Sequence, residues 1–306
     1  MIIITAPVHD FLIETLSQKG LEYIYAPQLS YSELYDIIDA ATGIIVSTNI
    51  KIDRQLLDKA VGLKWIGRIG SGMDHIDVEY AKSKYIICES SPEGNRNAVA
   101  EFAVSLLLNL MRNTYKSANE VRNHQWLRNE NRGPELTGKV IGIIGYGNTG
   151  SAFAKLLSSF DVSILAYDKY KSGFGNDVVE ESNLEKIFKY ADVISFHLPL
   201  TIETKHFANH DFFKQLQRQP ILLNTSRGSV INTASLIAAL KNGFIKGAAL
   251  DVLENEQLSS YNSEEKEEFE FLINQHNVII TPHIAGYSFE STYKMSRILL
   301  EKLGII

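Results

Sequence analysis

The stretch Val140-Ile141-Gly142-Ile143-Ile144-Gly145-Tyr146-Gly147-Asn148-Thr149-Gly150 decides the fold. An apolar run leads into the pattern G-x-G-x-x-G, and apolar residues at helical spacing (Phe153, Leu156 and Leu157) follow it. A strand, a glycine turn and a helix in this order are typical of dinucleotide-binding folds. The first glycine allows the turn, the second lets the backbone approach a pyrophosphate, and the third allows close helix packing. The anionic pyrophosphate would lie on unpaired amides at the helix N-terminus.

An acidic residue stands at the end of the next apolar run. Asp168 comes 18 residues after Gly150, where a carboxylate can bond both ribose hydroxyls of NAD and repel the extra phosphate of NADP. Lys169 and Lys171 are nearby cations that could accommodate such a phosphate. The sequence therefore predicts NAD as the cofactor.

Short apolar runs alternate with amphipathic segments along the whole chain. The predicted strands cover residues 2–6, 21–25, 43–46, 63–68 and 85–88 in the first part, and residues 140–145, 162–168, 193–197, 221–225, 247–251 and 278–281 in the second. Strands that alternate with helices indicate an α/β protein in which helices cover both faces of parallel sheets. We therefore predict two doubly wound parallel-sheet domains, which bind ligands beyond the carboxyl ends of their strands.

Three segments connect these two series. Apolar residues at i, i+3, i+4, i+7, i+8 and i+11 from Val99 predict a long helix, and the turn-rich residues 91–95 before it predict a domain boundary. Residues 113–138 lack clear periodicity and are interpreted as an arm that packs on a partner subunit. The amphipathic residues 290–303 are expected to return to the first domain.

Length and composition exclude several classes of protein. The 306 residues suit about two domains, and 45% hydrophobic with 22% charged residues is ordinary for a globular chain. A single cysteine, Cys88, cannot form an intrachain disulfide and favours a reducing compartment. The net charge of -6 argues against nucleic acid as a partner. No signal peptide and no run of about 20 apolar residues is found, so we expect a cytoplasmic protein without a membrane partner. No metal site is expected.

Three residues with charged or titratable side chains follow three of the predicted strands. Arg227 follows residues 221–225, Glu256 lies five residues after Asp251, and His283 follows residues 278–281. Each taken singly is more often a capping, turn or surface residue. In a parallel sheet, however, these strand ends share one crevice. Hydride transfer to a keto acid needs a proton donor, a cation for the carboxylate and a group that tunes the donor, and these three side chains supply them.

Five motifs in order carry a resemblance to the D-isomer-specific 2-hydroxyacid dehydrogenases over nearly the whole chain. They are the glycine turn with Asp168, His197-Leu198-Pro199-Leu200-Thr201, Asn224-Thr225-Ser226-Arg227-Gly228, Gly247-Ala248-Ala249-Leu250-Asp251-Val252, and Thr281-Pro282-His283-Ile284-Ala285-Gly286. The resemblance implies a Rossmann NAD-binding domain, residues 98–286, inserted in a flavodoxin-like substrate domain, residues 1–97 plus 287–306. It also implies a homodimer.

The same resemblance implies roles for individual residues. His283 matches the catalytic acid/base, Glu256 its partner, and Arg227 the arginine that holds the substrate carboxylate and keto oxygen. Ser71 and Gly72, in Gly70-Ser71-Gly72-Met73, match a loop whose amides grip the carboxylate. Asp251 matches a residue near the nicotinamide carboxamide and Thr225 one that lines the same pocket. The remaining residues that match cofactor contacts, besides those of the glycine turn, are Asp168, His197, Pro199, Ser226 and His283.

Residues 91–101 most resemble D-3-phosphoglycerate dehydrogenases, which oxidise phosphoglycerate to phosphohydroxypyruvate in serine biosynthesis. Val46-Ser47-Thr48-Asn49 departs from that pattern, because many such enzymes carry a phosphate-binding arginine there; Lys51, Arg54 or Arg96 could substitute. Residues 257–276 replace the usual proline after the glutamate with an acidic, helical excursion. Since the chain ends at Ile306, a serine-sensing regulatory domain is not expected.

Two alternatives stay open. Within the same chemistry, the chain could be a glyoxylate or hydroxypyruvate reductase or a D-lactate dehydrogenase. In another class, it could be an NAD(H)-sensing corepressor that binds protein partners, since such proteins retain Arg227, Glu256 and His283. The low content of basic residues favours the enzyme.

Overall fold

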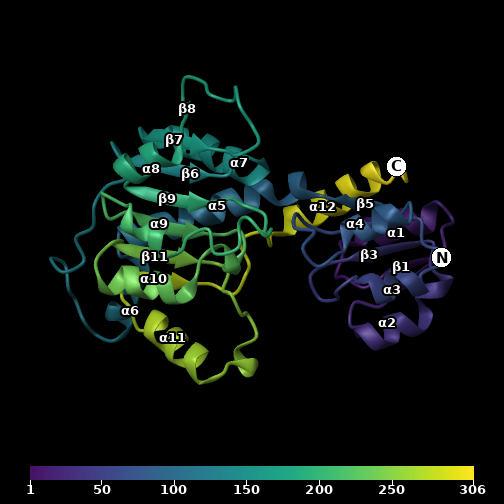
Figure 1. Cartoon of the computed structure of the whole chain (residues 1–306). Helices are drawn as coiled ribbons and strands as arrows, with labels where there is room; N and C mark the ends of the chain where they lie inside the picture. The colour runs from purple at the N-terminus through teal and green to yellow at the C-terminus, as the bar shows by residue number, and fades with distance from the viewer. The chain divides into compact units, whose positions relative to one another are not determined.

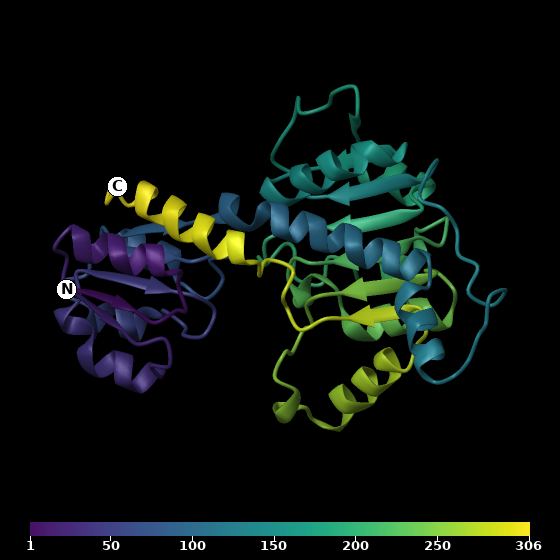
Figure 2. The same ribbon diagram turned by 180° about the vertical axis from the view of Figure 1, so that it is seen from behind.

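The computed structural model describes residues 1–306, which divide into two compact units (Figures 1 and 2). The first unit comprises Met1–Ala98 and Gly286–Ile306, and the second comprises Val99–Ala285. The division at Ala98 falls inside helix α5 (Pro92–Met111). No helix combines the length and the apolarity that crossing a bilayer requires.

The first unit is built on a five-stranded parallel sheet in the order β2-β1-β3-β4-β5. This is the 2-1-3-4-5 order of flavodoxin-like folds. The strands are β1 (Ile2–Ile4), β2 (Tyr23–Tyr25), β3 (Gly43–Val46), β4 (Trp65–Arg68) and β5 (Ile87–Ser90). The helices are α1 (Asp10–Gln18), α2 (Tyr31–Ile37), η1 (Ile38–Ala40), α3 (Arg54–Lys59), α4 (Val78–Ser83) and α12 (Phe289–Lys302).

The last helix, α12, belongs to the first unit although it follows the whole second unit in sequence. Its buried residues Met295, Leu299 and Leu300 share one apolar cluster with residues of β1 and α1. Residues 290–303, expected to return to the first domain, thus lie in the first unit, and the buried stripe of α12 gives a physical reason for their position.

The second unit is built on a seven-stranded parallel sheet in the order β8-β7-β6-β9-β10-β11-β12. Strands β6 to β11, numbered one to six along the chain, follow the 3-2-1-4-5-6 order of the Rossmann fold. The strands are β6 (Val140–Ile144), β7 (Ser163–Tyr167), β8 (Val179–Glu181), β9 (Val193–Phe196), β10 (Ile221–Asn224), β11 (Gly247–Leu250) and β12 (Val278–Ile280). The helices after α5 are α6 (Thr114–Arg122), α7 (Asn148–Leu157), η2 (Ser158–Phe160), α8 (Leu184–Tyr190), α9 (His210–Lys214), η3 (Gly228–Val230), α10 (Thr233–Lys241), η4 (Leu258–Ser260) and α11 (Ser263–Ile273).

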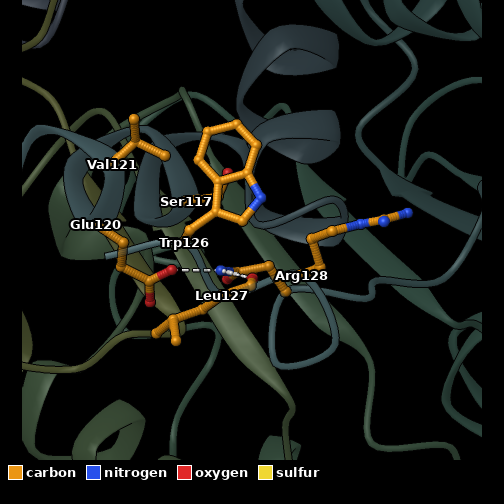
Figure 3. Close-up of a pocket in the computed structure, with 7 residues that line it drawn as sticks. Ser117, Glu120, Val121, Trp126, Leu127 and Arg128 are labelled. Atoms are coloured by element: carbon orange, nitrogen blue, oxygen red, sulfur yellow. Dashed lines mark hydrogen bonds between the residues drawn. The ribbon is translucent and has the colours of Figure 1, made fainter. Parts of the chain in front are cut away.

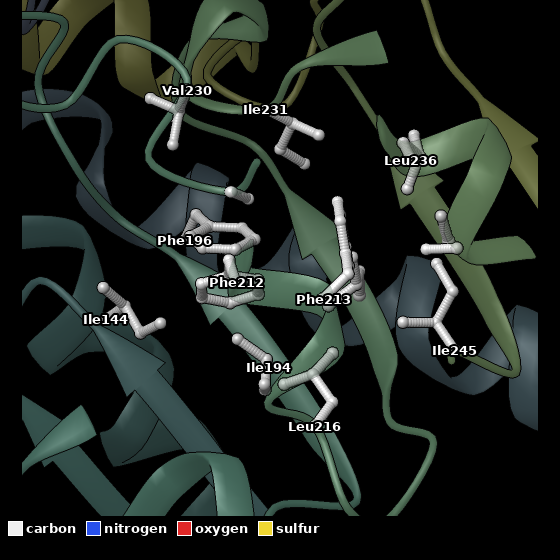
Figure 4. Packing of buried hydrophobic residues seen from close by; sticks show 14 of the residues in the cluster. Ile144, Ile194, Phe196, Phe212, Phe213, Leu216, Val230, Ile231, Leu236 and Ile245 are labelled. Atoms are coloured by element: carbon white, nitrogen blue, oxygen red, sulfur yellow. The ribbon is translucent and has the colours of Figure 1, made fainter. Parts of the chain in front are cut away.

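Apolar residues cover both faces of this second sheet, as a doubly wound fold requires. Adjacent residues of one strand join different clusters: Leu222 of β10 packs with α8, α9 and α10, whereas Leu223 packs with α5 and α7. This alternation follows from the period of two in a strand. Figure 4 shows the first of these clusters, where Phe196 of β9 and Phe212 of α9 lie against one another. The predicted α/β class with two doubly wound sheets is confirmed.

Three local features differ from what the sequence suggested. Residues 91–95 do not form a turn between domains, because α5 already begins at Pro92. Proline at the first helical position is favourable, since its missing N–H would have no partner there, and Glu93 suits the first turn. Residues 113–138, which lack clear periodicity in the sequence, contain the helix α6 at residues 114–122. No residue of α6 is buried, so it left no apolar stripe in the sequence. Strand β8, absent from the six predicted strands, contains only Val179, Glu180 and Glu181.

The acidic excursion after Glu256 is helical, as predicted. Asn262 accepts a hydrogen bond from the backbone N–H of Glu265, and the Glu265 carboxylate accepts one from the N–H of Asn262. This capping box explains why a segment rich in glutamate starts a helix here.

Candidate active site

The glycine-rich turn between β6 and α7 has two positions that only glycine fits. Gly145 has a φ of +96°, and a Cβ there would lie 2.3 Å from the carbonyl oxygen of His197. A Cβ on Gly150 would lie 2.1 Å from the carbonyl oxygen of Gly145, so a missing side chain lets α7 start directly against the turn. Gly147 has no heavy atom within 4 Å of its would-be Cβ, which leaves its backbone open to a ligand. These are the three demands that a dinucleotide turn makes on glycine.

Two further observations fit a dinucleotide at this turn. Gly147 is the N-cap of α7, and no side chain caps the first amides of the helix, which therefore suit an anion. The Oγ1 atom of Thr225, after β10, is buried and has no hydrogen-bond partner. Buried polar atoms are normally satisfied, so a ligand group is a natural partner for this hydroxyl. Gly147, Asn148 and Thr225 could therefore hold parts of a dinucleotide.

Asp168 joins the residues after β7 to the glycine turn. Its Oδ2 accepts a hydrogen bond from the N–H of Tyr146 at 2.8 Å. Its Oδ1 accepts from the N–H groups of Tyr170 and Lys171 at 2.9 and 3.0 Å. Because an ionised carboxylate offers about four acceptor positions, capacity remains for a ribose hydroxyl.

His197 lies beneath the turn and supports it. Its Nε2 lies 2.9 Å from Ser195 Oγ and its Nδ1 lies 3.2 Å from Thr149 Oγ1. Burial lowers the pKa of His197 to about 3, so the imidazole is neutral at physiological pH. Both ring nitrogens are used within the protein, and the N–H of His197 donates to the carbonyl oxygen of Ile144 at 2.8 Å, so the contact of His197 with a cofactor stays a prediction. Pro199, after it, accepts a hydrogen bond from Thr204 Oγ1 at 2.6 Å through its carbonyl oxygen.

The structure places Arg227, Glu256 and His283 after three neighbouring strands, β10, β11 and β12. Glu256 and His283 are joined directly, with 2.9 Å between Oε2 and Nδ1. Their side chains are 44% and 38% exposed, so the pair is accessible to a substrate. The bond to Nδ1 leaves Nε2 on the opposite side of the ring.

Arg227 lies in a turn fixed by the buried Asn224. The Asn224 side chain donates to the carbonyl oxygen of Arg227 at 2.9 Å and accepts from the N–H and hydroxyl of Ser226 at 3.1 and 2.8 Å. Next to it, Gly228 packs so closely that a Cβ would lie 1.9 Å from the backbone of Leu253. This approach brings the turn of Arg227 against the segment that leads to Glu256.

Asp251 anchors the loop that carries His283. Its carboxylate accepts hydrogen bonds from Thr281 Oγ1 at 2.6 Å, from the N–H of Ile284 at 3.0 Å and from the N–H of Ala285 at 2.7 Å. Its carbonyl oxygen accepts from the N–H of His283 at 2.8 Å. His283 has a φ of +55°, a left-handed conformation that a residue with a side chain rarely adopts without support. Burial raises the pKa of Asp251, and the hydrogen bonds from the loop oppose that shift.

A second histidine–glutamate pair was not found from the sequence. Glu254 accepts hydrogen bonds from the N–H and hydroxyl of Thr233 at 2.7 and 2.6 Å, and its other oxygen contacts His206 Nε2. These contacts tie the segment before Glu256 to the start of α10. The partners of Glu254 lie far from it in sequence. The only signal for a functional role of Glu254 was therefore its closeness to Glu256 in the sequence. No group of three or more His, Cys, Asp or Glu side chains is arranged to hold a metal ion.

The predicted substrate residues Ser71 and Gly72 belong to the first unit and follow β4. The buried Arg68 donates from Nε to the carbonyl oxygen of Gly72 at 3.0 Å, and Ser71 donates to Asn95 Oδ1 at 2.9 Å. Gly70 has a φ of +127°. The loop is thus held by Arg68 at the end of β4 and by Asn95 of α5, and its role towards a carboxylate stays a prediction.

Comparison with known proteins places these features in context. A family model described as the NAD binding domain of D-isomer specific 2-hydroxyacid dehydrogenases matches residues 104–285. A glyoxylate reductase from Thermofilum pendens is 38% identical over 281 residues, which is 90% of this chain and 80% of that protein. A D-3-phosphoglycerate dehydrogenase from Methanocaldococcus jannaschii is 34% identical over 307 residues, which is 99% of this chain and 56% of that protein. The chain thus spans about half the length of this second relative.

A solved structure agrees with the fold over nearly its whole length. The D-lactate dehydrogenase from Aquifex aeolicus, complexed with NAD and lactic acid, superposes with a TM-score of 0.85 at 28% identity and covers 99% of this chain and 94% of its own.

Proposed function

The chain belongs to the family of D-isomer specific 2-hydroxyacid dehydrogenases, NAD-using oxidoreductases, and on that premise we propose that Arg227, Glu256 and His283 are its catalytic residues. The observation that carries this proposal is the 2.9 Å bond between His283 and Glu256, beside the end of the strand that leads to Arg227. When bound, NAD accepts a hydride from the carbon that bears the hydroxyl, and NADH returns it. The reaction interconverts a D-2-hydroxy acid and its 2-keto acid.

His283 moves the proton. In the direction of reduction, the protonated ring donates a proton from Nε2 to the carbonyl oxygen; in oxidation, the neutral ring accepts the hydroxyl proton at the same atom. The hydrogen bond from Nδ1 to Glu256 fixes the ring so that Nε2 is the atom left for the substrate. Glu256 thus sets the orientation and the tautomer of the ring, which is a role of an acidic partner in acid–base pairs.

Arg227 binds the charged end of the substrate. A guanidinium can bond a carboxylate and the neighbouring carbonyl oxygen at the same time, a planar fork that lysine lacks. The bonds from Asn224 that hold the backbone turn, together with the bond from Arg227 Nη1 to the carbonyl oxygen of Ser226 at 2.7 Å, limit the positions open to this side chain. Thr225 and Ser226, in the same turn, remain proposed cofactor contacts.

For the substrate we propose D-3-phosphoglycerate and phosphohydroxypyruvate, which would place the protein in serine biosynthesis. The match of 99% of the chain to a D-3-phosphoglycerate dehydrogenase supports this choice. Arg54 is the cation that could serve the phosphate after β3, although its Nε now bonds Asp77 at 3.0 Å. A phosphate, with more negative charge than one carboxylate, can compete for such an exposed arginine.

Glyoxylate or hydroxypyruvate is the second candidate substrate, and a specific observation favours it. The residues after β3 where a phosphate-binding arginine was expected are neutral: Ser47 donates to Asn49 Oδ1 at 2.8 Å, and Asn49 donates to the carbonyl oxygen of Thr5 at 2.7 Å. These bonds engage the side chains of Ser47 and Asn49 within the protein. A keto acid without a phosphate needs no cation there.

Oxidation of NADH with a panel of 2-keto acids tests both candidates. We expect kcat/KM for phosphohydroxypyruvate to exceed that for hydroxypyruvate by about tenfold or more, the value of one or more charge-assisted bonds to the phosphate. Glyoxylate and pyruvate complete the panel, and steady-state rates at fixed NADH are the measurement. The two hydroxypyruvates differ only in the phosphate, so each serves as the control for the other.

Two results would redirect the assignment. Equal or better use of hydroxypyruvate or glyoxylate would remove phosphoglycerate as the substrate and leave the family chemistry intact. Absence of turnover with every acid, while NADH still binds, would contradict the catalytic proposal and support an NAD(H)-sensing binding protein.

We also propose that the protein forms a homodimer through α6 and the loop after it. This surface exposes Tyr115, Val121 and Trp126, with Trp126 77% exposed. Figure 3 shows a pocket beside Trp126, whose lining residues are Ser117, Glu120, Val121, Trp126, Leu127, Arg128 and Asn131. Exposed aromatic residues around a pocket are typical of the central contacts of protein interfaces.

Replacing Trp126 with alanine is expected to weaken the dimer about 30-fold or more, the effect of losing a central interface aromatic. Sedimentation equilibrium over a range of concentrations measures the dissociation constant. Tyr85→Ala is the matched control, because it removes another exposed aromatic ring, in the first unit. A wild-type protein that sediments as a monomer would rule out the dimer without affecting the proposed chemistry.

A further inference from the structure

A charged cluster follows Asp168 and includes a residue from a distant loop. Lys169 Nζ lies 2.7 Å from Glu203 Oε2, and the hydroxyl of Tyr170 donates to the same oxygen at 2.6 Å. The hydrogen bond from Lys169 lowers the pKa of Glu203, and the bond to Glu203 raises the pKa of Lys169, so both are charged at neutral pH. The first of the two lysines after Asp168 is therefore paired.

Glu203 is held in position by its own turn. The N–H of Thr201 donates to Thr204 Oγ1 at 2.8 Å, and the N–H of Thr204 lies 3.2 Å from Thr201 Oγ1. These reciprocal bonds on either side of Glu203 fix the short segment that carries it. Because the backbone that carries Glu203 is already ordered, pairing with Lys169 costs only the entropy of the two side chains.

The sheet order places this ion pair beside the cofactor site. Strand β6, which leads into the glycine turn, lies between β9 and β7. Glu203 is on the loop after β9, whereas Lys169 comes directly after the Asp168 that ends the β7 segment. Their contact therefore reaches across the end of β6, next to the residues proposed to bind the adenosine ribose.

Charge at this place decides which dinucleotide is bound. The 2′-phosphate of NADP adds close to two negative charges beside the ribose, whereas NAD has a hydroxyl there. Asp168 favours the hydroxyl and repels the phosphate. A lysine directly after Asp168 would cancel this repulsion if its ammonium group were at the 2′-position.

We propose that Glu203 is a specificity-determining residue, which holds the Lys169 ammonium away from the ribose 2′-position and so makes the site select NAD over NADP. Tyr170 supports Glu203 by donating to the oxygen that bonds Lys169. The inference rests on the proposed place of the ribose beside Asp168. It does not depend on which 2-keto acid the protein uses.

Direct binding of NADH and NADPH, without any 2-keto acid, tests the proposal. Titration followed by nicotinamide fluorescence gives both dissociation constants for the wild type, Glu203→Gln, Lys169→Ala and the double variant. We expect Glu203→Gln to strengthen NADPH binding by about tenfold and to change NADH binding by less than about twofold. The gain should shrink at high salt, because the released lysine acts through an exposed charge.

The double variant identifies the residue that acts. If Lys169 carries the effect, Glu203→Gln in the Lys169→Ala background gives no gain in NADPH binding; a gain that persists there would mean that Glu203 repels the phosphate directly and would overturn the proposal. An unchanged NADPH constant in Glu203→Gln would overturn it as well. Glu301→Gln is the control, since it removes one carboxylate from another exposed ion pair, with Arg297 at 2.7 Å on α12.

Discussion

Replacement of His283 by alanine is expected to lower kcat for reduction of the preferred 2-keto acid by about 100-fold or more, while NADH binding persists. The reason is the position of the ring. Glu256 holds Nδ1 at 2.9 Å, and Nε2 is then the only atom of the pair able to donate a proton to a carbonyl oxygen. The glycine turn and Asp168, which would bind most of the cofactor, remain intact in this variant.

Steady-state rates and a fluorescence titration with NADH check this result together. His276→Ala is the matched control, because His276 is an exposed histidine in the same unit. A His283→Ala variant that turns over near the wild-type rate would remove this residue from the mechanism. A variant that loses NADH binding instead would show that the ring mainly supports the cofactor.

Asp251→Asn is the second large expected effect, and it acts on both stability and rate. Asparagine keeps the shape of the side chain but replaces one acceptor oxygen with an N–H donor, which then faces N–H or O–H groups of the loop. Loss of one or two of the three bonds to this buried carboxylate lowers the free energy of unfolding by about 2–4 kcal/mol. Since these bonds also hold His283 in its left-handed conformation, kcat falls by about tenfold or more.

Urea unfolding and steady-state kinetics measure the two effects. Asp177→Asn provides the control, since Asp177 is exposed in the same unit. A loss of stability with an unchanged kcat would mean that Asp251 stabilises the fold but does not position His283 for catalysis. Wild-type values in both measurements would mean that the loop after β12 keeps its conformation without Asp251.

The features that the sequence could predict are those that depend on residues close together in the chain. The apolar run before Gly145, the spacing of the three glycines and the acid at Asp168 all lie within one strand–helix–strand unit, and the turn has the expected geometry. The parallel sheets follow from alternation alone. Arg227, Glu256 and His283 each follow a strand of the same parallel sheet. They were expected at one edge because the carboxyl ends of parallel strands lie on the same side of the sheet.

The features that escaped prediction depend on contacts between distant residues or on very weak patterns. Strand β8 has one buried apolar residue, Val179, and pairs only because β7 offers a free edge. The support of the His283 loop by Asp251 joins residues about thirty positions apart, and the Lys169–Glu203 contact joins residues with no common motif. Periodicity carries no information about such pairs, because each partner alone resembles an ordinary polar surface or turn residue.

The buried imidazole under the glycine turn gives the fold a sensitivity to acid. The pKa of an ordinary histidine is 6.5, whereas burial lowers the pKa of His197 in the folded chain to about 3. Between these values the unfolded chain binds a proton that the folded chain does not, so acidification steadily favours unfolding over this range. The stabilising contribution of the neutral ring is complete above pH 6.5. The same ring that contacts both Thr149 and Ser195 thus sets a lower limit of pH for the stability of the second unit.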